Sequence, residues 1–71
     1  MFINFVKRVR QRQGLSQTKC ARLIGVSESN LSSVERGAIR PWPKIRRDLA
    51  SVLSVSESDL FPVEEVSNVS K

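Results

Sequence analysis

Apolar residues recur at helical spacing in several short stretches of the chain, and glycine or proline separates one stretch from the next. Residues 2–13 alternate apolar and basic positions, which predicts an amphipathic helix ending near Gly14; the first three or four residues could instead be extended. A second helix is predicted between Ser16, a typical N-cap, and Gly25. The second of these helices is short, about two and a half turns.

The middle of the chain predicts two further helices. Ser27 offers an N-cap for a helix that runs to Arg36 and is closed by Gly37. Proline is tolerated in the first turn of a helix, so a fourth helix can begin at Pro43, and its apolar stripe continues to Leu53. The spacing therefore predicts four helices before residue 54.

A last short helix and a tail complete the pattern. Ser56, followed three residues later by Asp59, resembles a capping box for a helix that contains Leu60 and stops before Pro62. Residues 63–71 place valines among Glu, Ser and Asn, and we expect a polar C-terminal tail for which order is not guaranteed. One all-α domain of four or five short helices is expected over residues 1–62.

Composition excludes several classes of function. A chain of 71 residues has room for one small core and no cleft between domains. It has no His and no Tyr, and a single cysteine, Cys20, so it can form neither an intrachain disulfide nor a complete zinc site. No apolar run is long enough to span a bilayer. We expect no enzyme, no cofactor, no metal and no membrane partner, and a cytoplasmic protein.

The charge is distributed unevenly. Residues 1–47 hold eleven basic and two acidic side chains, whereas residues 48–71 hold one basic and five acidic. The first part therefore carries +9 and the second −4. A field of that strength on a small domain attracts a polyanion, with nucleic acid first and an anionic membrane surface second.

The stretch from Gly14 to Gly37 has the pattern of a helix-turn-helix. Ala21 is small where two helices would cross, and Gly25 permits a left-handed turn between them. The rest of the second helix of this pair is polar and is not needed for a core. That face could enter the major groove of DNA, which is about 12 Å wide.

At this point the chain resembles the phage-repressor-type, or Xre-type, helix-turn-helix family of bacterial and phage transcription regulators. The resemblance covers roughly residues 3–61 without a gap. It rests on these residues taken together: Gly14 to Gln17, Ala21, Gly25 to Ser27, Leu31, Val34 to Gly37, Pro41, Leu49 and Ala50, Leu53, Val55 and Ser56, and Asp59 to Phe61. It implies a lambda-repressor-like DNA-binding fold.

The resemblance also implies which side chains meet double-stranded DNA. Glu28, Ser29 and Ser33 occupy the positions that read base edges, and Asn30 and Ser32 border them. The expected phosphate contacts are Arg10, Gln17, Ser27, Arg36 and Arg40. Arg10 also matches one half of an ion pair with Glu35 that orients the reading helix.

The expected function is sequence-specific transcriptional regulation, with repression favoured, by a homodimer on a palindromic operator. Two half-sites one helical turn apart, roughly 34 Å, would supply enough specificity. Trp42, Val55 and Phe61 are the candidates for the dimer interface. Two alternatives remain: a protein-interaction module such as an antitoxin or anti-repressor component, and sequence-blind binding of nucleic acid or an anionic membrane by the basic part.

Overall fold

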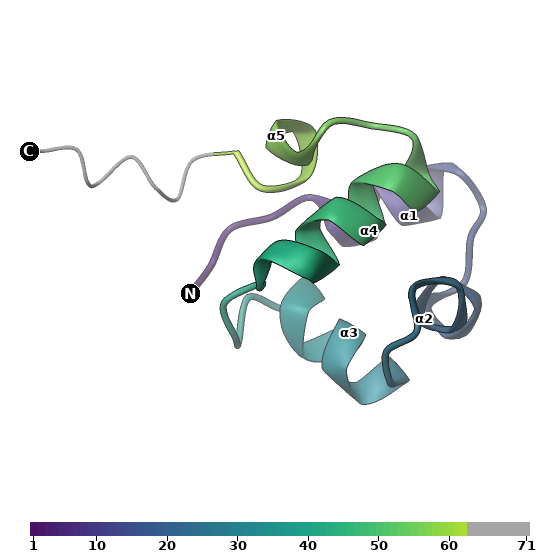
Figure 1. Ribbon diagram of the computed structural model, residues 1–71, viewed down its shortest axis with the longest axis horizontal. Coiled ribbons are helices and arrows are strands. Elements are labelled where there is room, and N and C mark those ends of the chain that lie inside the picture. Colours follow the sequence, from purple (N-terminus) through teal and green to yellow (C-terminus); the bar gives the residue numbers. More distant parts are fainter. Residues whose placement is uncertain (63–71) are drawn as a thin grey trace, which may run out of the picture.

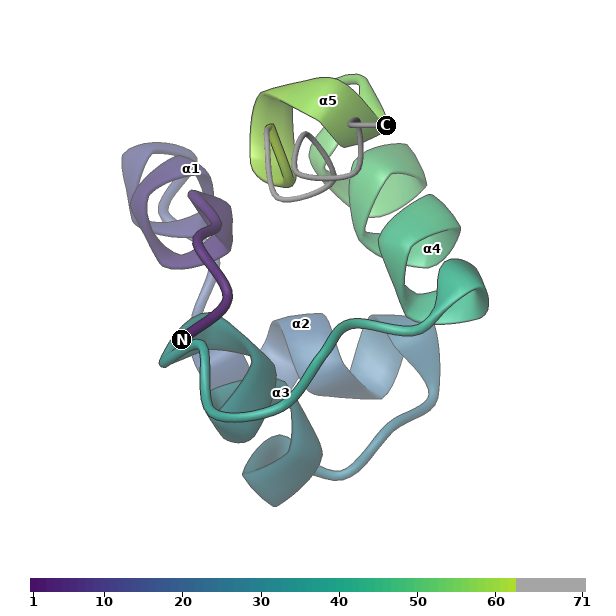
Figure 2. The same cartoon turned by 90° about the vertical axis from the view of Figure 1, so that its left-hand side faces the viewer.

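The computed structural model describes residues 1–62, and the predicted C-terminal tail lies outside these residues. Within them the chain forms five helices and no strand, which confirms the all-α expectation. The helices are α1 (Val6–Arg12), α2 (Gln17–Ile24), α3 (Glu28–Glu35), α4 (Pro43–Leu53) and α5 (Glu57–Leu60). In Figure 1 α4 crosses the middle of the view with α3 below it, and Figure 2 shows α1 and α4 on opposite sides above α2 and α3.

Three of the five helices, α2, α3 and α5, begin at a serine that caps them. Ser16 accepts a hydrogen bond from the Lys19 N–H, and Ser27 accepts one from the Asn30 N–H, as the sequence predicts. The capping box of α5 is also confirmed, with both of its reciprocal bonds present. Pro43 is the first residue of α4 and follows Trp42, which caps that helix without a side-chain hydrogen bond. Local chemistry therefore fixes where these helices start.

The predicted tight turn of the helix-turn-helix is present. Gly25 has a φ of 74°, in the left-handed region, and ends α2. The Val26 N–H then donates to the Ala21 carbonyl at 3.0 Å. Ala21 is buried at the place where α2 meets α3 and α4. The close approach of these helices depends on that small side chain.

One apolar core joins all five helices. Its largest members are Phe61, Leu31, Ile45, Leu49, Leu53 and Leu60, with Val6, Val34, Cys20, Ala21, Ile24 and Ala50 completing it. The thiol of Cys20 is wholly buried, and burial raises its pKa above the ordinary value, with the nearby Glu35 carboxylate adding to the rise. Cys20 is therefore a core residue.

Residues 1–5 lie outside the first helix, so the helix starts later than residue 2, as the alternative for the first three or four residues allowed. The Phe2 N–H donates to the Gly37 carbonyl at 3.0 Å, and the Phe5 N–H donates to the Leu60 carbonyl at 2.8 Å. Asn4 donates to the Val34 carbonyl at 2.8 Å. This N-terminal strap, residues 2–5, joins the ends of α3 and α5 and leaves α1 to start at Val6.

The backbone of Phe2 in the strap lies directly against Gly37, and replacing this glycine should loosen the contact between the strap and the end of α3. Its φ is 76°, and a Cβ added there would lie 2.6 Å from the Phe2 carbonyl oxygen. We expect Gly25→Ala, at a similar φ with open space around it, to cost about 1 to 2 kcal/mol of unfolding free energy. Gly37→Ala should cost about 1 to 3 kcal/mol more, because backbone must also move.

Urea unfolding of the two variants measures this difference. Equal losses of unfolding free energy in Gly37→Ala and Gly25→Ala would show that the strap yields without cost.

Candidate nucleic-acid interface

α3 presents one side to the core and the other to solvent. Leu31 and Val34 are wholly buried and anchor it. The predicted base-reading residues lie away from that buried side: Glu28, Ser29 and Asn30 are exposed, and Ser32 and Ser33 are half-buried. The five candidates therefore share the outer part of one helix.

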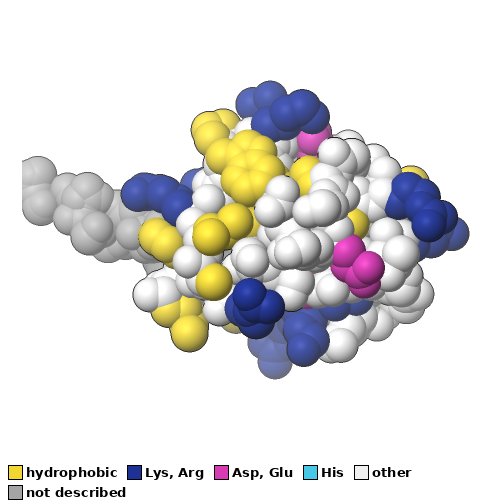
Figure 3. All heavy atoms as spheres, turned by 90° about the horizontal axis from the view of Figure 1, so that it is seen from below, with side chains coloured by type: hydrophobic (Ala, Val, Ile, Leu, Met, Phe, Trp, Pro, Cys, Tyr) yellow, Lys and Arg dark blue, Asp and Glu magenta, His cyan; other side chains and the backbone are white. Residues whose placement is uncertain are grey.

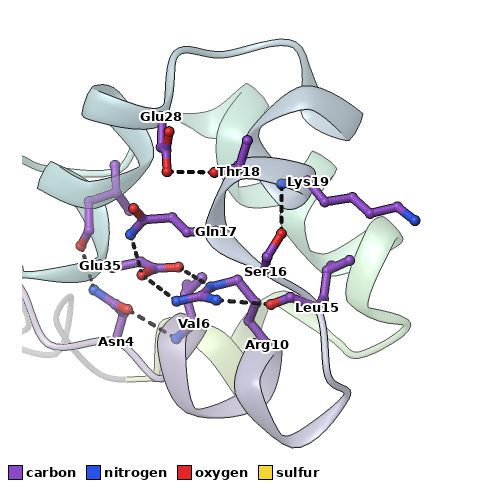
Figure 4. Close-up of polar contacts among 11 residues, drawn as sticks. Asn4, Val6, Arg10, Leu15, Ser16, Gln17, Thr18, Lys19, Glu28 and Glu35 are labelled. Atoms are coloured by element: carbon purple, nitrogen blue, oxygen red, sulfur yellow. Dashed lines mark hydrogen bonds and ion pairs between the residues drawn. The ribbon is translucent and has the colours of Figure 1, made fainter.

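The orientation of α3 depends on a buried carboxylate at its end. Glu35 accepts two hydrogen bonds from Arg10, at 2.7 Å and 3.1 Å, and one from the Gln17 amide at 3.0 Å. Arg10 also donates to the Leu15 carbonyl at 2.9 Å. Figure 4 shows these groups converging from α1, α2 and α3. The ion pair implied by the family resemblance is present, and we call these four residues the Glu35 cluster.

Burial decides the role of Arg10. Its side chain is 7% exposed and that of Glu35 is 2% exposed. The hydrogen bond with Glu35 raises the pKa of the guanidinium above its ordinary value, outweighing the effect of burial. The guanidinium faces inward, and its bonds to Glu35 and Leu15 position α3. The phosphate contact of Arg10 stays a prediction.

Two of the expected phosphate contacts lie at neighbouring helix starts. Gln17 is the first residue of α2 and is half-buried, with one amide hydrogen committed to Glu35. Ser27 is exposed, and its oxygen accepts the α3 capping bond, which leaves the hydroxyl hydrogen able to donate. Helix N-termini favour anions, so both positions suit a phosphate.

The two arginines that follow α3 are exposed but differ in their contacts. Arg36 donates to the Ser32 hydroxyl at 2.9 Å and lies 3.5 Å from the Ser33 hydroxyl. Arg36, expected to contact a phosphate, is thus hydrogen-bonded to Ser32 and Ser33, which are expected to contact bases. Their spacing of three and four residues along a helix could have predicted these bonds. Arg40 lies over the Phe2 ring, 5.9 Å from its centroid.

Figure 3 looks on the underside of the molecule, the side on which α3 lies in Figure 1. Backbone and side chains that are neither charged nor apolar occupy the middle of this face, with apolar side chains beside them. Lys and Arg side chains stand around its margin, and few acidic groups are visible. This arrangement suits a nucleic acid whose phosphates contact the Lys and Arg side chains at the margin and whose bases contact the groups in the middle.

Two contacts of this region were not predicted from the sequence. The Thr18 hydroxyl of α2 donates to Oε2 of Glu28 on α3 at 2.7 Å. Asn4 bridges two helices, because it donates to the Val34 carbonyl and accepts from the Val6 N–H at 3.0 Å. The bonds of Thr18 to Glu28 and of Asn4 to Val34 have no signal in the local sequence, since each joins segments that only the fold brings together.

The three dimer candidates fall in different surroundings. Phe61 is 1% exposed and lies in the core of its own chain, and its place in a dimer interface stays a prediction. Val55 is half-buried and lines a cavity of about 390 Å³ between α1 and the start of α5. Trp42 is 36% exposed. The length of α4 separates Trp42 from Val55, roughly 16 Å for its eleven residues.

The described part of the chain gives no sign of a metal centre or a membrane span. Over residues 1–62 no three Cys, Asp or Glu side chains gather as metal ligands. In the same residues no helix is long and apolar enough to cross a bilayer.

Comparisons with known proteins agree with this geometry. A family model described as a helix-turn-helix domain matches residues 4–61. The chain is 35% identical over 60 residues to YazB of Bacillus subtilis, an uncharacterized HTH-type transcriptional regulator, covering 84% of this chain and 87% of YazB. It is also 35% identical to the HTH-type transcriptional regulator PuuR of Escherichia coli, covering 80% of this chain but only 31% of PuuR.

Solved structures with the same arrangement include longer chains. An HTH_3 family transcriptional regulator from Vibrio cholerae superposes with a TM-score of 0.67 and 37% identity, over 76% of this chain and 30% of that one. A chain of the SinR protein/SinI protein complex gives a TM-score of 0.76 and 30% identity, over 92% of this chain and 64% of that one. The chain thus spans less than two thirds of each of these structural neighbours.

Breaking the Glu35 cluster should destabilise the domain strongly. Arg10→Met leaves a buried carboxylate without its cation, and we expect a loss of about 3 to 5 kcal/mol in unfolding free energy. Lys44 and Asp48 supply a matched control, because their ion pair is also 2.7 Å long but its Lys44 side chain is 68% exposed.

Lys44→Met should cost about 0.5 kcal/mol or less. Chemical denaturation of both variants makes the comparison. A loss of under about 1 kcal/mol for Arg10→Met would contradict the role given to the cluster.

Proposed function

The chain belongs to the helix-turn-helix transcriptional regulators of the Xre, or lambda-repressor-like, kind, and we propose that it binds operator DNA sequence-specifically with α3 in the major groove. The observation that carries this proposal is the outer face of α3, rich in hydrogen-bonding side chains and held rigidly by the Glu35 cluster. A helix of ordinary diameter enters a major groove about 12 Å wide.

The base contacts are assigned to the outer face of α3. Glu28 offers only acceptors when ionised, Asn30 can both donate and accept, and serine hydroxyls adapt to several base edges. Ser32 and Ser33 already accept hydrogen bonds from Arg36, which leaves their hydroxyl hydrogens to donate to base acceptors. Together with Ser29 these side chains can discriminate among base pairs.

The phosphate contacts are assigned to the margin of the same face. Gln17 and Ser27 act at helix N-termini, and Arg36 and Arg40 flank the end of α3. Each contact to a phosphate contributes affinity that is largely independent of base sequence and is weakened by salt. No residue of the chain is assigned a catalytic role, since binding alone accounts for regulation.

We further propose that two copies bind a palindromic operator and repress transcription there. One copy of α3 meets only a few base pairs, so a homodimer is the simplest way to reach useful specificity. Trp42 and Val55 mark two separate candidate surfaces for the second copy, at opposite ends of α4.

A second candidate function is capture of a protein partner. It is favoured by the structural neighbour solved as the SinR protein/SinI protein complex and by the exposed apolar side chains Leu23 and Trp42. Co-purification of a second protein in place of DNA would support it.

A binding selection from random duplex DNA at near-physiological salt tests the leading proposal, and an enriched inverted repeat is expected. Ser33→Ala and Ser29→Ala should each change the preference at one base position by roughly 1 kcal/mol or more. Arg40→Ala should weaken all sequences alike and lower the salt slope by about one. Unfolding free energies serve as the control, because Arg40 also contacts Phe2.

Recovery of unenriched DNA would mean sequence-blind binding. A base preference that changes in Arg40→Ala but not in the serine variants would reverse the assignment of roles.

The dimer is tested by sedimentation equilibrium with and without the enriched duplex. Trp42→Ser and Val55→Ser alter separate surfaces, so we expect one of them, and not both, to weaken self-association about tenfold or more. A monomer that binds the inverted repeat without cooperativity would contradict the homodimer.

A further inference from the structure

We propose that Thr18 and Glu28 act together as a cytosine reader, in which the threonine hydroxyl holds the glutamate carboxylate in place to accept from cytosine N4. This inference rests on the proposed binding of α3 in the major groove. It goes beyond that proposal by naming the base that one residue selects and a residue of α2 that positions it.

The contact joins the first turns of two helices. Thr18 is the second residue of α2, and Glu28 is the first residue of α3. The hydroxyl of Thr18 donates to Oε2 of Glu28 at 2.7 Å, and both residues are exposed. Figure 4 shows the two side chains pointing toward each other across the space between the helices.

This hydrogen bond is not needed to hold α2 against α3. Ala21 and Leu31 are buried at 2% and 0% exposure in the core shared by these helices, and Gln17 reaches Glu35 from the same turn as Thr18. An exposed hydrogen bond adds little to a junction that is already packed. Its main effect is to fix a side chain that solvent would otherwise leave free to rotate.

Fixing that side chain prepares it for a base. A mobile glutamate loses rotamer freedom when it binds, whereas one already held by Thr18 has lost much of it beforehand. The bond occupies Oε2 and leaves Oε1 able to accept. The reading atom is therefore one carboxylate oxygen at the start of α3.

The chemistry of the carboxylate selects the base. An ionised carboxylate accepts and cannot donate, so guanine and thymine, which present acceptors in the major groove, repel it. On its own major-groove edge adenine presents the N6 donor together with the N7 acceptor, whereas cytosine presents the N4 donor and no acceptor. Cytosine is the base that a carboxylate favours most clearly.

The experiment selects binding sites from random duplex DNA with four proteins: the wild type, Glu28→Gln, Thr18→Val and Thr18→Ser. The wild type should prefer cytosine at one position of each half-site by about fivefold or more. Glu28→Gln should move that position toward adenine, because an amide both donates to N7 and accepts from N6.

The threonine variants separate positioning from packing. Thr18→Val keeps the shape but removes the hydroxyl, and it should reduce the cytosine preference at that position about threefold or more, with other positions unchanged. Thr18→Ser keeps the donor and should restore the preference. Equal unfolding free energies for the two variants would show that folding is not the cause.

The outcomes divide clearly. Absence of any enriched motif with the wild-type protein overturns the proposed function and this inference together. If a motif is enriched but the base that depends on Glu28 is not cytosine, the assignment of cytosine to Glu28 is wrong while the proposed function stands. If the cytosine preference is unchanged in Thr18→Val, Thr18 does not position Glu28.

Discussion

The buried carboxylate of Glu35 is the constraint on which the reading surface depends. A charge taken out of water must be met by donors, and here Arg10 and Gln17 supply them from two other helices. All of these bonds form together at one orientation of α3. Apolar contacts alone are less directional, and α3 has only Leu31 and Val34 with which to make them. A short helix that keeps one side free for a partner therefore takes its orientation from a polar network.

Apolar and polar side chains have different roles in the rest of the molecule as well. Side chains that face the core are apolar and set how closely the helices approach, whereas polar side chains at the rim set their angles and ends. Asn4 joins the start of α1 to the Val34 carbonyl of α3, and Thr18 of α2 donates to Glu28 of α3. The reading helix is thus held along its buried side and at its end, while the Thr18 contact fixes the Glu28 side chain at its start.

Sequence reasoning succeeded where the determining chemistry lies within one helical turn. The capping role of Ser16 and the left-handed turn at Gly25 follow from the residues themselves, and the family resemblance supplied the packing order of the helices. It could not show where the tips of long or large side chains lie. The inward direction of Arg10, the burial of Phe61 and the contact of Thr18 with Glu28 appear only in the folded chain. The assignments of bases and phosphates remain predictions.

The N-terminal strap has a consequence for the order of events during synthesis. The Phe2 N–H pairs with the Gly37 carbonyl, and the Phe5 N–H pairs with the Leu60 carbonyl, so residues made early wait for partners made much later. Contacts between such distant residues form only after the intervening chain has been ordered. The contacts of the strap with the end of α3 can form once Gly37 has been made, whereas its contact with α5 requires Leu60. The strap therefore closes in two steps, and it joins α3 to α5 in the nascent polypeptide only after α5 has emerged.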